Sequence, residues 1–399
     1  MATSDTVALV EKALAEGNGI LRLAPAWVAR NTVPPGRRLG LPEQAYDAGE
    51  RGWICERWLG SCTRAENAIG PADEGLSYLA VDGEARTALL DAVTVAGPAI
   101  LGADYARSHT TLGYLAKIFD CEDRLPYHLH PMRQHAALVG RNPKEEAYYF
   151  PEDVPMGKHP ETFFGVHPYI VEDEKFDTLL PYLVVWNDDQ ILKHSRAFLQ
   201  VPDEGFHVPS GVLHAPGTAL TIELQEESDV GATFQALNAG RILPKQRLFK
   251  NVRPEDQAEY GERFALQMID WELNGDPYFY ENRHLSPRLC VQQPGGAEYW
   301  IFYNSDVFSG KKLVVSPGQS FVTQDRGAYG VFAWRGTGTY GGRSLAGGVP
   351  GSDELVVSYE RAIKPLVVAN TGDRDLVVLK FFGADVNPDA PRISRRLAP

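Results

Sequence analysis

The chain has 399 residues, of which 44% are hydrophobic and 23% charged, a composition typical of a globular protein with two or three lobes. The net charge of −13 argues against a nucleic-acid backbone or an anionic membrane surface as the main partner. Four cysteines without a C-x-x-C pair indicate a reducing, cytoplasmic environment rather than a disulfide framework. There is neither a secretion-signal pattern nor an apolar run of about eighteen residues, so we expect no membrane span.

The N-terminal part of the chain predicts short helices and strands. Ser4 and Asp5 are capping residues for a helix over 6–16, and aromatic and charged residues alternate in a predicted strand within 49–61. A second helix is expected over 84–96. The following apolar residues of 104–120 lead into the first chemical motif.

Two histidines stand close together at 125–131, Leu-Pro-Tyr-His-Leu-His-Pro. Successive side chains of a strand point to opposite faces, so His128 and His130 share one face. Two imidazoles on one face are a metal-ligand arrangement. Taken alone, the pair is as easily explained by exposed or hydrogen-bonded histidines.

A carboxylate and a third histidine follow at a distance. If 142–150 is the next strand, Lys144 and Glu146 point to the same side. A Pro-Ser-Gly turn then leads to His214, and the alternating segment 219–225 puts Glu223 on the side opposite its apolar residues. A carboxylate at Glu223 could shuttle a proton or could orient a metal ligand, and both interpretations stay open here.

The remaining chain divides by composition. Short helices are expected between 151 and 200, as a lid or flank, and one helix over 254–274. From 292 onward, seven apolar runs separated by turn residues predict a second β-barrel or sandwich, which contains no histidine. The Gly-rich stretch 336–348 predicts a mobile turn rather than a phosphate loop. We therefore expect a metal-binding domain over 1–252, a helical segment over 253–291 and a metal-free β domain over 292–399.

His-x-His, a carboxylate on the next strand and a distant histidine after a Gly-containing turn resemble the two-part motif of the cupins. The resemblance implies a mainly β fold of cupin jelly-roll barrels, with a metal-binding N-terminal cupin, a degenerate C-terminal cupin-like barrel, and inserted and flanking helices. Three imidazoles and a carboxylate would hold a divalent metal with open positions. We expect Zn²⁺, and the same ligands also suit Mn, Fe, Co or Ni.

Around the same motifs the chain resembles the type I phosphomannose isomerases. That family has Leu-Ser-Ile-Gln-x-His-Pro followed by Lys-Pro-Glu, where this chain has Leu125-Pro-Tyr-His-Leu-His-Pro131 and Lys144-Glu-Glu146. Its second site, Val-Pro-Ala-Gly-x-x-His-Ala, is similar to Val208-Pro-Ser-Gly-Val-Leu-His-Ala215. The likeness extends over about residues 21–252.

The resemblance implies a role for each matching residue. The metal set would be His128, His130, Glu146 and His214. Glu223 would lie near the acid/base position and Lys144 near the substrate phosphate. Arg241 and Lys245 are further catalytic-site candidates, for the substrate's anionic end.

Some positions depart from the family pattern. Pro126 replaces the phosphate-anchoring serine, and no arginine closely follows Ser228-Asp229. His128 stands where the family has Gln, and the Pro-Lys pair is displaced to Pro244-Lys245. Whether the substrate is phosphorylated therefore stays open.

The leading hypothesis is a metal-dependent aldose–ketose isomerase that acts through an enediolate on a small-molecule sugar or sugar phosphate. Two alternatives remain. A three-histidine, one-carboxylate site can also hold the iron of a cupin oxygenase or lyase. A cupin of this kind can also bind a sugar without catalysis. The sequence indicates neither the sugar nor the oligomeric state.

Overall fold

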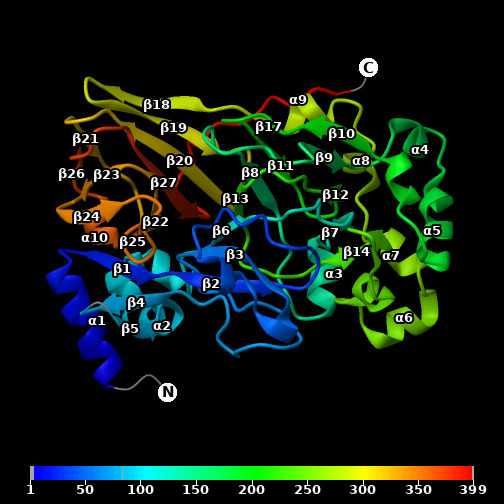
Figure 1. Cartoon of the computed structure of the whole chain (residues 1–399), viewed down its shortest axis with the longest axis horizontal. Coiled ribbons are helices and arrows are strands. Elements are labelled where there is room, and N and C mark those ends of the chain that lie inside the picture. The colour runs from blue at the N-terminus through cyan, green and yellow to red at the C-terminus, as the bar shows by residue number, and fades with distance from the viewer. Residues whose placement is uncertain (1–3, 83, 398–399) are drawn as a thin grey trace.

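A computed structural model describes residues 4–82 and 84–397. Two β-rich halves lie side by side, with helices gathered at the two ends of the longest axis (Figure 1). The half nearer α4 to α7 carries the histidine motifs, and we call it the N-terminal barrel. The other half is formed mainly by the last hundred or so residues, and we call it the C-terminal barrel.

Two sheets form the N-terminal barrel. The seven-stranded sheet has the order β17-β11-β8-β13-β6-β3-β2, and the five-stranded sheet the order β10-β9-β12-β7-β14. In chain order their strands are β2 (Ala26–Arg30), β3 (Trp53–Leu59), β6 (Leu115–Phe119), β7 (His128–Leu129), β8 (Glu146–Tyr149), β9 (Glu161–Phe164), β10 (Arg196–Leu199), β11 (Gly205–Val208), β12 (His214–Ala215), β13 (Thr221–Gln225), β14 (Ala232–Thr233) and β17 (His284–Leu285). A two-stranded ribbon follows, β15 (Leu237–Asn238) with β16 (Arg241–Ile242).

The C-terminal barrel contains all seven strands that the sequence predicted. Its nine-stranded sheet has the order β18-β19-β20-β27-β22-β25-β1-β4-β5, and its four-stranded sheet the order β21-β26-β23-β24. The strands are β1 (Ile20–Ala24), β4 (Tyr78–Val81), β5 (Glu84–Ala88), β18 (Arg288–Gln293), β19 (Gly296–Phe302), β20 (Phe308–Val315), β21 (Ser320–Thr323), β22 (Tyr329–Arg335), β23 (Thr337–Tyr340), β24 (Arg343–Ala346), β25 (Glu354–Val357), β26 (Leu366–Asn370) and β27 (Leu376–Gly383). Because β1 pairs with β25, the N-terminal segment takes part in this sheet. The division at residues 252 and 292 stays a prediction.

Helices cover the ends of the two barrels. They are α1 (Ser4–Glu16), α2 (Leu89–Leu101), α3 (Arg133–Leu138), α4 (Pro168–Glu172), α5 (Leu180–Val185), α6 (Pro254–Tyr260), α7 (Arg263–Gln267), α8 (Trp271–Asn274), α9 (Phe279–Arg283) and α10 (Tyr359–Ala362). Short 3₁₀ turns include η4 (Phe176–Leu179), η5 (Gln190–His194) and η6 (Lys245–Phe249). The mixture of short helices expected between 151 and 200 is therefore found, together with β9 and β10.

Three sequence predictions of local structure are wrong. The expected helix over 84–96 begins only at Leu89, because 84–88 pairs with β4 as strand β5. The expected helix over 254–274 is three helices, since Gly261 leaves helical geometry at a φ of 54° and the side chain of Asp270 caps α8. The Gly-rich stretch 336–348 is the β23–β24 hairpin, whose turn residues Gly341 and Gly342 both have positive φ.

Successive side chains of β13 point alternately into the core between the barrels and into the cavity of the N-terminal barrel. Ile222 and Leu224 are fully buried in a core shared with Phe302 and Phe381 of the C-terminal barrel. The residue between them, Glu223, points the other way and lines the cavity of the N-terminal barrel. One strand therefore packs the two barrels together and supplies a carboxylate to the cavity.

A buried ion pair also connects the barrels. Arg57 of β3 donates to both oxygens of Asp353 at 2.7 Å and to Glu354 at 3.1 Å. Its neighbour Glu56 faces the opposite side of β3 and lines the cavity. The packing of the C-terminal barrel thus fixes the strand that bears Glu56.

A cluster of ion pairs is buried in the C-terminal barrel. Lys380 lies 2.8 Å from Asp325, and Lys311 lies 2.7 Å from the other oxygen of the same carboxylate. Glu298 completes the set, 3.3 Å from Lys311 and 2.5 Å from Lys380. All four side chains are buried, and they lie in the same barrel as an apolar core that includes Phe321, Tyr329 and Phe382.

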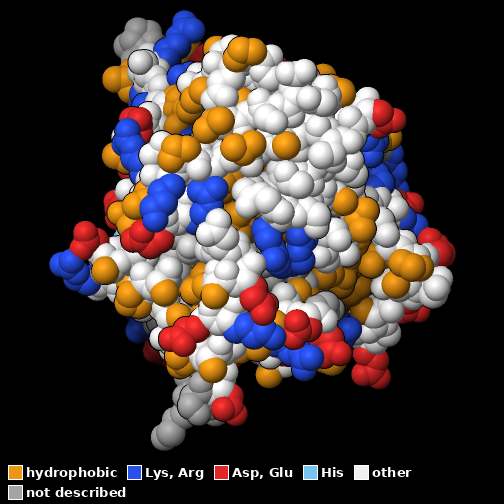
Figure 2. Space-filling model, turned by 90° about the vertical axis from the view of Figure 1, so that its left-hand side faces the viewer, with side chains coloured by type: hydrophobic (Ala, Val, Ile, Leu, Met, Phe, Trp, Pro, Cys, Tyr) orange, Lys and Arg blue, Asp and Glu red, His pale blue; other side chains and the backbone are white. Residues whose placement is uncertain are grey.

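The end of the molecule seen in Figure 2 carries basic and acidic side chains interspersed, with hydrophobic side chains scattered among them. Over the described ranges, 4–82 and 84–397, no helix is long and apolar enough to cross a membrane.

Candidate metal centre

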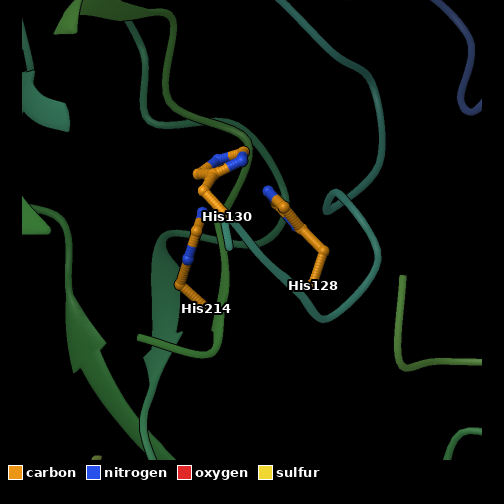
Figure 3. Close-up of side chains that lie close together, drawn as sticks. All are labelled: His128, His130 and His214. Atoms are coloured by element: carbon orange, nitrogen blue, oxygen red, sulfur yellow. The ribbon is translucent and has the colours of Figure 1, made fainter. Parts of the chain in front are cut away.

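Three histidines from two neighbouring strands meet at one point (Figure 3). His128 begins β7 and lies opposite His214 of β12 in the antiparallel register, and His130 follows just after β7. One ring nitrogen of each residue lies within 4.8 Å of those of the other two. The structure therefore brings together the three imidazoles that the sequence singled out.

The other nitrogen of each ring is held by a backbone carbonyl. Nδ1 of His128 lies 2.6 Å from the oxygen of Pro126, that of His130 lies 2.7 Å from Val230, and that of His214 lies 2.9 Å from Val212. A carbonyl can only accept, so each Nδ1 carries the proton and each Nε2 keeps a lone pair. This second contact is what orients histidines that bind metals. The Nε2 of His130 lies 3.0 Å from Nζ of Lys144.

Glu146, the first residue of β8, faces these nitrogens. Its Oε1 lies 3.0 Å from Nε2 of His214, and its Oε2 lies 3.1 Å from Nε2 of His130. The hydroxyl of Tyr148 donates to Oε1. Nε2 of His214 is buried without a hydrogen-bond partner among the described residues.

This donor set fits a divalent cation. The unprotonated Nε2 of His214 and Oε1 of Glu146, 3.0 Å apart, would face each other with lone pairs, which is unfavourable unless a cation lies between them. Burial lowers the pKa of His130 to about 3 and keeps the pKa of His128 well below its ordinary value. Both rings are then neutral at neutral pH, which is the form that binds metals.

Lys144 joins this set to a second carboxylate. Its Nζ lies 2.8 Å from Oε2 of Glu146 and 3.2 Å from Oε1 of Glu223. Burial opposes its charge, but the two carboxylates outweigh that effect and raise its pKa, so the ammonium stays charged. Burial also opposes the charge of Glu146, yet Lys144 and the histidines hold its pKa well below its usual range.

Glu223 is the second buried carboxylate. Its Oε1 also lies 3.2 Å from Nζ of Lys117, which stands directly opposite it on β6. Burial raises the pKa of Glu223, the charge of Glu146 raises it further, and the two lysines oppose both effects. Its raised pKa is a property that general bases in enzymes share.

Apart from His214, which is fully buried, these groups line one cavity of about 440 Å³, large enough for a small organic molecule. Deeper in its wall, Glu56 accepts hydrogen bonds from Arg30 at 2.8 Å and from the indole of Trp58 at 2.7 Å. Arg30 also pairs with Asp229 at 3.1 Å.

No protein-family model matches the chain, and no curated protein sequence matches it. Among solved structures, it is similar to the mannose 6-phosphate isomerase from Bacillus subtilis, at 14% identity and a TM-score of 0.63, over 91% of this chain and 99% of that one. A zinc-bound mannose 6-phosphate isomerase is similar at 12% sequence identity and a TM-score of 0.63, over 92% of this chain and 100% of that one. A single-residue mutant of phosphomannose isomerase from Salmonella typhimurium is similar at 13% sequence identity and a TM-score of 0.61, over 91% of this chain and 99% of that one.

The chain has the phosphomannose isomerase fold. Its mainly β architecture of cupin barrels, expected from the histidine motifs, is therefore confirmed, and the likeness now covers both barrels rather than residues 21–252 alone.

The two other catalytic-site candidates lie outside the cavity of this fold. Lys245 pairs with Glu262 and donates to the carbonyl of Val184 at 2.9 Å. Arg241 is exposed, donates to the carbonyl of Thr32 at 2.7 Å and lies over the ring of Trp53. Neither of the two lines the cavity, so the structure does not join them to the metal ligands.

Sequence reasoning missed several residues of the cavity wall. Lys117 could have been found, because it is opposite Glu223 once β6 and β13 are paired. Arg30 and Asp229 are brought together by the fold from segments far apart in the chain. Arg247, two residues beyond Lys245, also lines the cavity and carried no signal of its own.

Proposed function

We propose that this protein is a metal-dependent aldose–ketose isomerase of the mannose-6-phosphate isomerase type. The observation that carries the proposal is the convergence of three Nε2 lone pairs and a buried carboxylate beside a second buried carboxylate, Glu223, on the phosphomannose isomerase fold. That combination supplies an electrophilic centre and a base in one cavity, and isomerisation needs both.

In this proposal His128, His130, Glu146 and His214 hold the metal, and zinc is the ion that we expect. When bound there, a divalent ion supplies Lewis-acid stabilisation of negative charge on the sugar's oxygens.

Glu223 is proposed as the base that moves the proton between C2 and C1. Removing the proton from C2 leaves an enediolate. Returning it to C1, together with transfer of the O2 hydroxyl proton to O1, completes the conversion of aldose to ketose. Lys117 and Lys144, each 3.2 Å from Oε1, hold the carboxylate in position from two sides. Lys144 reaches both carboxylates and so joins the base to the metal ligands.

The test is a screen of metal-loaded protein against neutral and phosphorylated aldoses, with ketose formation as the measurement. The proposal predicts turnover of at least one aldose, lost when His214 is replaced by Ala. Oxygen consumption by the iron-loaded protein without ketose formation would favour a cupin oxygenase instead. Sugar binding without turnover under any metal would indicate a binding protein.

A further inference from the structure

The cavity changes in chemical character along the direction of its strands. In the sheet register, Lys117 of β6, Glu223 of β13 and Tyr148 of β8 form one row across three strands. The proposed metal ligand Glu146 precedes this row by two residues on β8, and Phe119 follows it by two residues on β6. All five side chains line the cavity. Two residues of a strand span about 6–7 Å, so Phe119 lies about the length of a hexose chain beyond the row of the base.

Apolar side chains continue the wall beyond Phe119. They are Val33, Cys121, Leu125 and Pro126, and we call these four residues together with Phe119 the apolar end of the cavity. Val33, Phe119 and Cys121 are buried in one hydrophobic cluster, and Leu125 packs against it. Pro126 has no N–H group to donate. None of the five side chains carries a charge at neutral pH.

The polar atoms at the apolar end are already hydrogen-bonded or uncharged. The carbonyl of Pro126 lies 2.6 Å from Nδ1 of His128, and the N–H of Leu125 donates to the carbonyl of Pro216 at 3.0 Å. A hydrogen bond with a neighbouring thiol, together with burial, raises the pKa of Cys121 well above its ordinary value, so this thiol stays neutral. A ligand group that reaches the apolar end therefore meets mainly carbon.

The positive charges of the cavity wall have partners of their own. A carboxylate oxygen lies within 3.6 Å of the charged nitrogens of five cations: Arg30, Arg51, Lys117, Lys144 and Lys250. Arg247 donates to Oγ1 of Thr32 at 3.1 Å and to Oδ1 of the exposed Asn31 at 2.6 Å. An anionic group at the apolar end would have to draw one of these cations away from its present contacts.

These surroundings favour an apolar group over a polar one. A phosphate or carboxylate at the apolar end would lose its hydration without donors to replace it, and a hydroxyl would be left without a partner. A methyl group gains from burial there, because its contact with the wall removes apolar surface from water on both sides.

We propose that the apolar end makes the protein specific for a 6-deoxyaldose, a sugar whose carbon most remote from the carbonyl group is a methyl group. With its carbonyl end at the metal ligands and C2 at Glu223, such a sugar directs its methyl group toward Phe119 and Leu125. This inference rests on the proposed function for the reaction, but the preference for a methyl group can be tested without turnover.

The probes are three polyols that have no carbonyl group and cannot be isomerised: mannitol, 6-deoxymannitol and mannitol 6-phosphate. Calorimetry with the metal-loaded full chain compares their affinities, and the same triplet on the glucitol and galactitol backbones covers other hydroxyl configurations. On the backbone that fits, the deoxy compound should bind about 10- to 100-fold more tightly than the parent polyol, the range over which an apolar pocket discriminates against a hydroxyl. The phosphate should bind no more tightly than the parent.

Leu125→Asn places an amide at the apolar end with little change in size. It should lower the preference for the deoxy compound by about 3- to 10-fold and leave the affinity for the parent polyol nearly unchanged. Leu125 is only half-buried, so the variant should fold. Val33→Thr, which keeps the branched shape of a buried side chain and adds a hydroxyl, is a second variant with the same expected direction.

Leu138→Asn is the matched control. It makes the same change at an exposed residue of α3 outside the cavity, and the preference should change less than about twofold.

Tightest binding of the phosphate, or no preference for the deoxy compound on any backbone, would overturn the proposal. Equal weakening of all three polyols by Leu125→Asn would also overturn it, because the residue would then act on the fold rather than on specificity. A preference for the methyl group in a protein that isomerises no aldose would refute the proposed reaction and leave the specificity standing. Turnover of an aldose 6-phosphate without turnover of its 6-deoxy analogue would do the reverse.

Discussion

Replacing Glu223 by Gln tests whether Glu223 is the base while other residues hold the metal. The amide has nearly the shape of the carboxylate but cannot accept a proton from carbon. Loss of a general base typically lowers turnover by about 10²–10⁴-fold, which corresponds to about 2.7–5.5 kcal/mol in the activation barrier. We expect this loss with metal content unchanged, since Glu223 lies outside the cluster of the three histidines.

The ion pairs of Glu223 determine how much Glu223→Gln lowers the free energy of unfolding. Without the carboxylate, Lys144 keeps Glu146 at 2.8 Å, whereas Lys117 keeps only Glu56, at 3.9 Å. One buried ammonium is then less well compensated, and the free energy of unfolding should fall by about 1–3 kcal/mol. The variant should still fold, so its kinetics can be measured on native protein.

The assay is steady-state turnover of the aldose found by screening, together with metal analysis of the same sample. Glu226→Gln is the matched control, because this nearby carboxylate accepts from the backbone of Glu145 at 2.9 Å and lies outside the cavity. Its turnover should change less than about threefold. If Glu223→Gln keeps full turnover, the base lies elsewhere; if it loses its metal, Glu223 is structural.

Three further predictions concern other parts of the molecule. His214→Ala should release the metal and lower the melting temperature, because binding to the folded state contributes to folding; a variant that retains one ion per chain by metal analysis would exclude His214 from the ligands. Burial raises the pKa of Glu227 to about 7, so stability should fall by about 2–3 kcal/mol as pH rises from about 4.5 to 8, and Glu227→Gln should flatten this slope in denaturant titrations. An unchanged slope would contradict the assignment. A fragment of residues 1–291 should be insoluble, because β1 would lose β25 and the apolar face of β13 would be exposed; a soluble, active fragment would show that the C-terminal barrel is dispensable.

The alternation of side chains along a strand made it predictable that the three histidines meet at one site. His128 and His130 are two residues apart, and the turn before His214 marks the start of its own strand. The alternation of 219–225 likewise places Glu223 and Ile222 on opposite faces of β13, as the sequence predicts. Period-two patterns of this kind depend only on local backbone geometry.

Contacts between distant segments were not predictable in the same way. Lys245 was chosen from a family-like Pro-Lys pair, yet it lies on a 3₁₀ turn with three residues per turn, so its neighbour Arg247 points in a different direction. The helix expected over 254–274 was wrong because Gly261 and Asp270 interrupt it, although its apolar residues do enter the core. Arg30 pairs with Asp229 only because the fold joins β2 to a loop far along the chain.

The most direct test of the metal-dependent isomerase is a titration of metal-free protein with Zn²⁺, in which bound metal and ketose formation are measured on the same samples. We predict that both rise together and reach saturation at about one ion per chain. Full turnover by the metal-free protein, or saturation with metal without isomerisation of any aldose, would contradict the account.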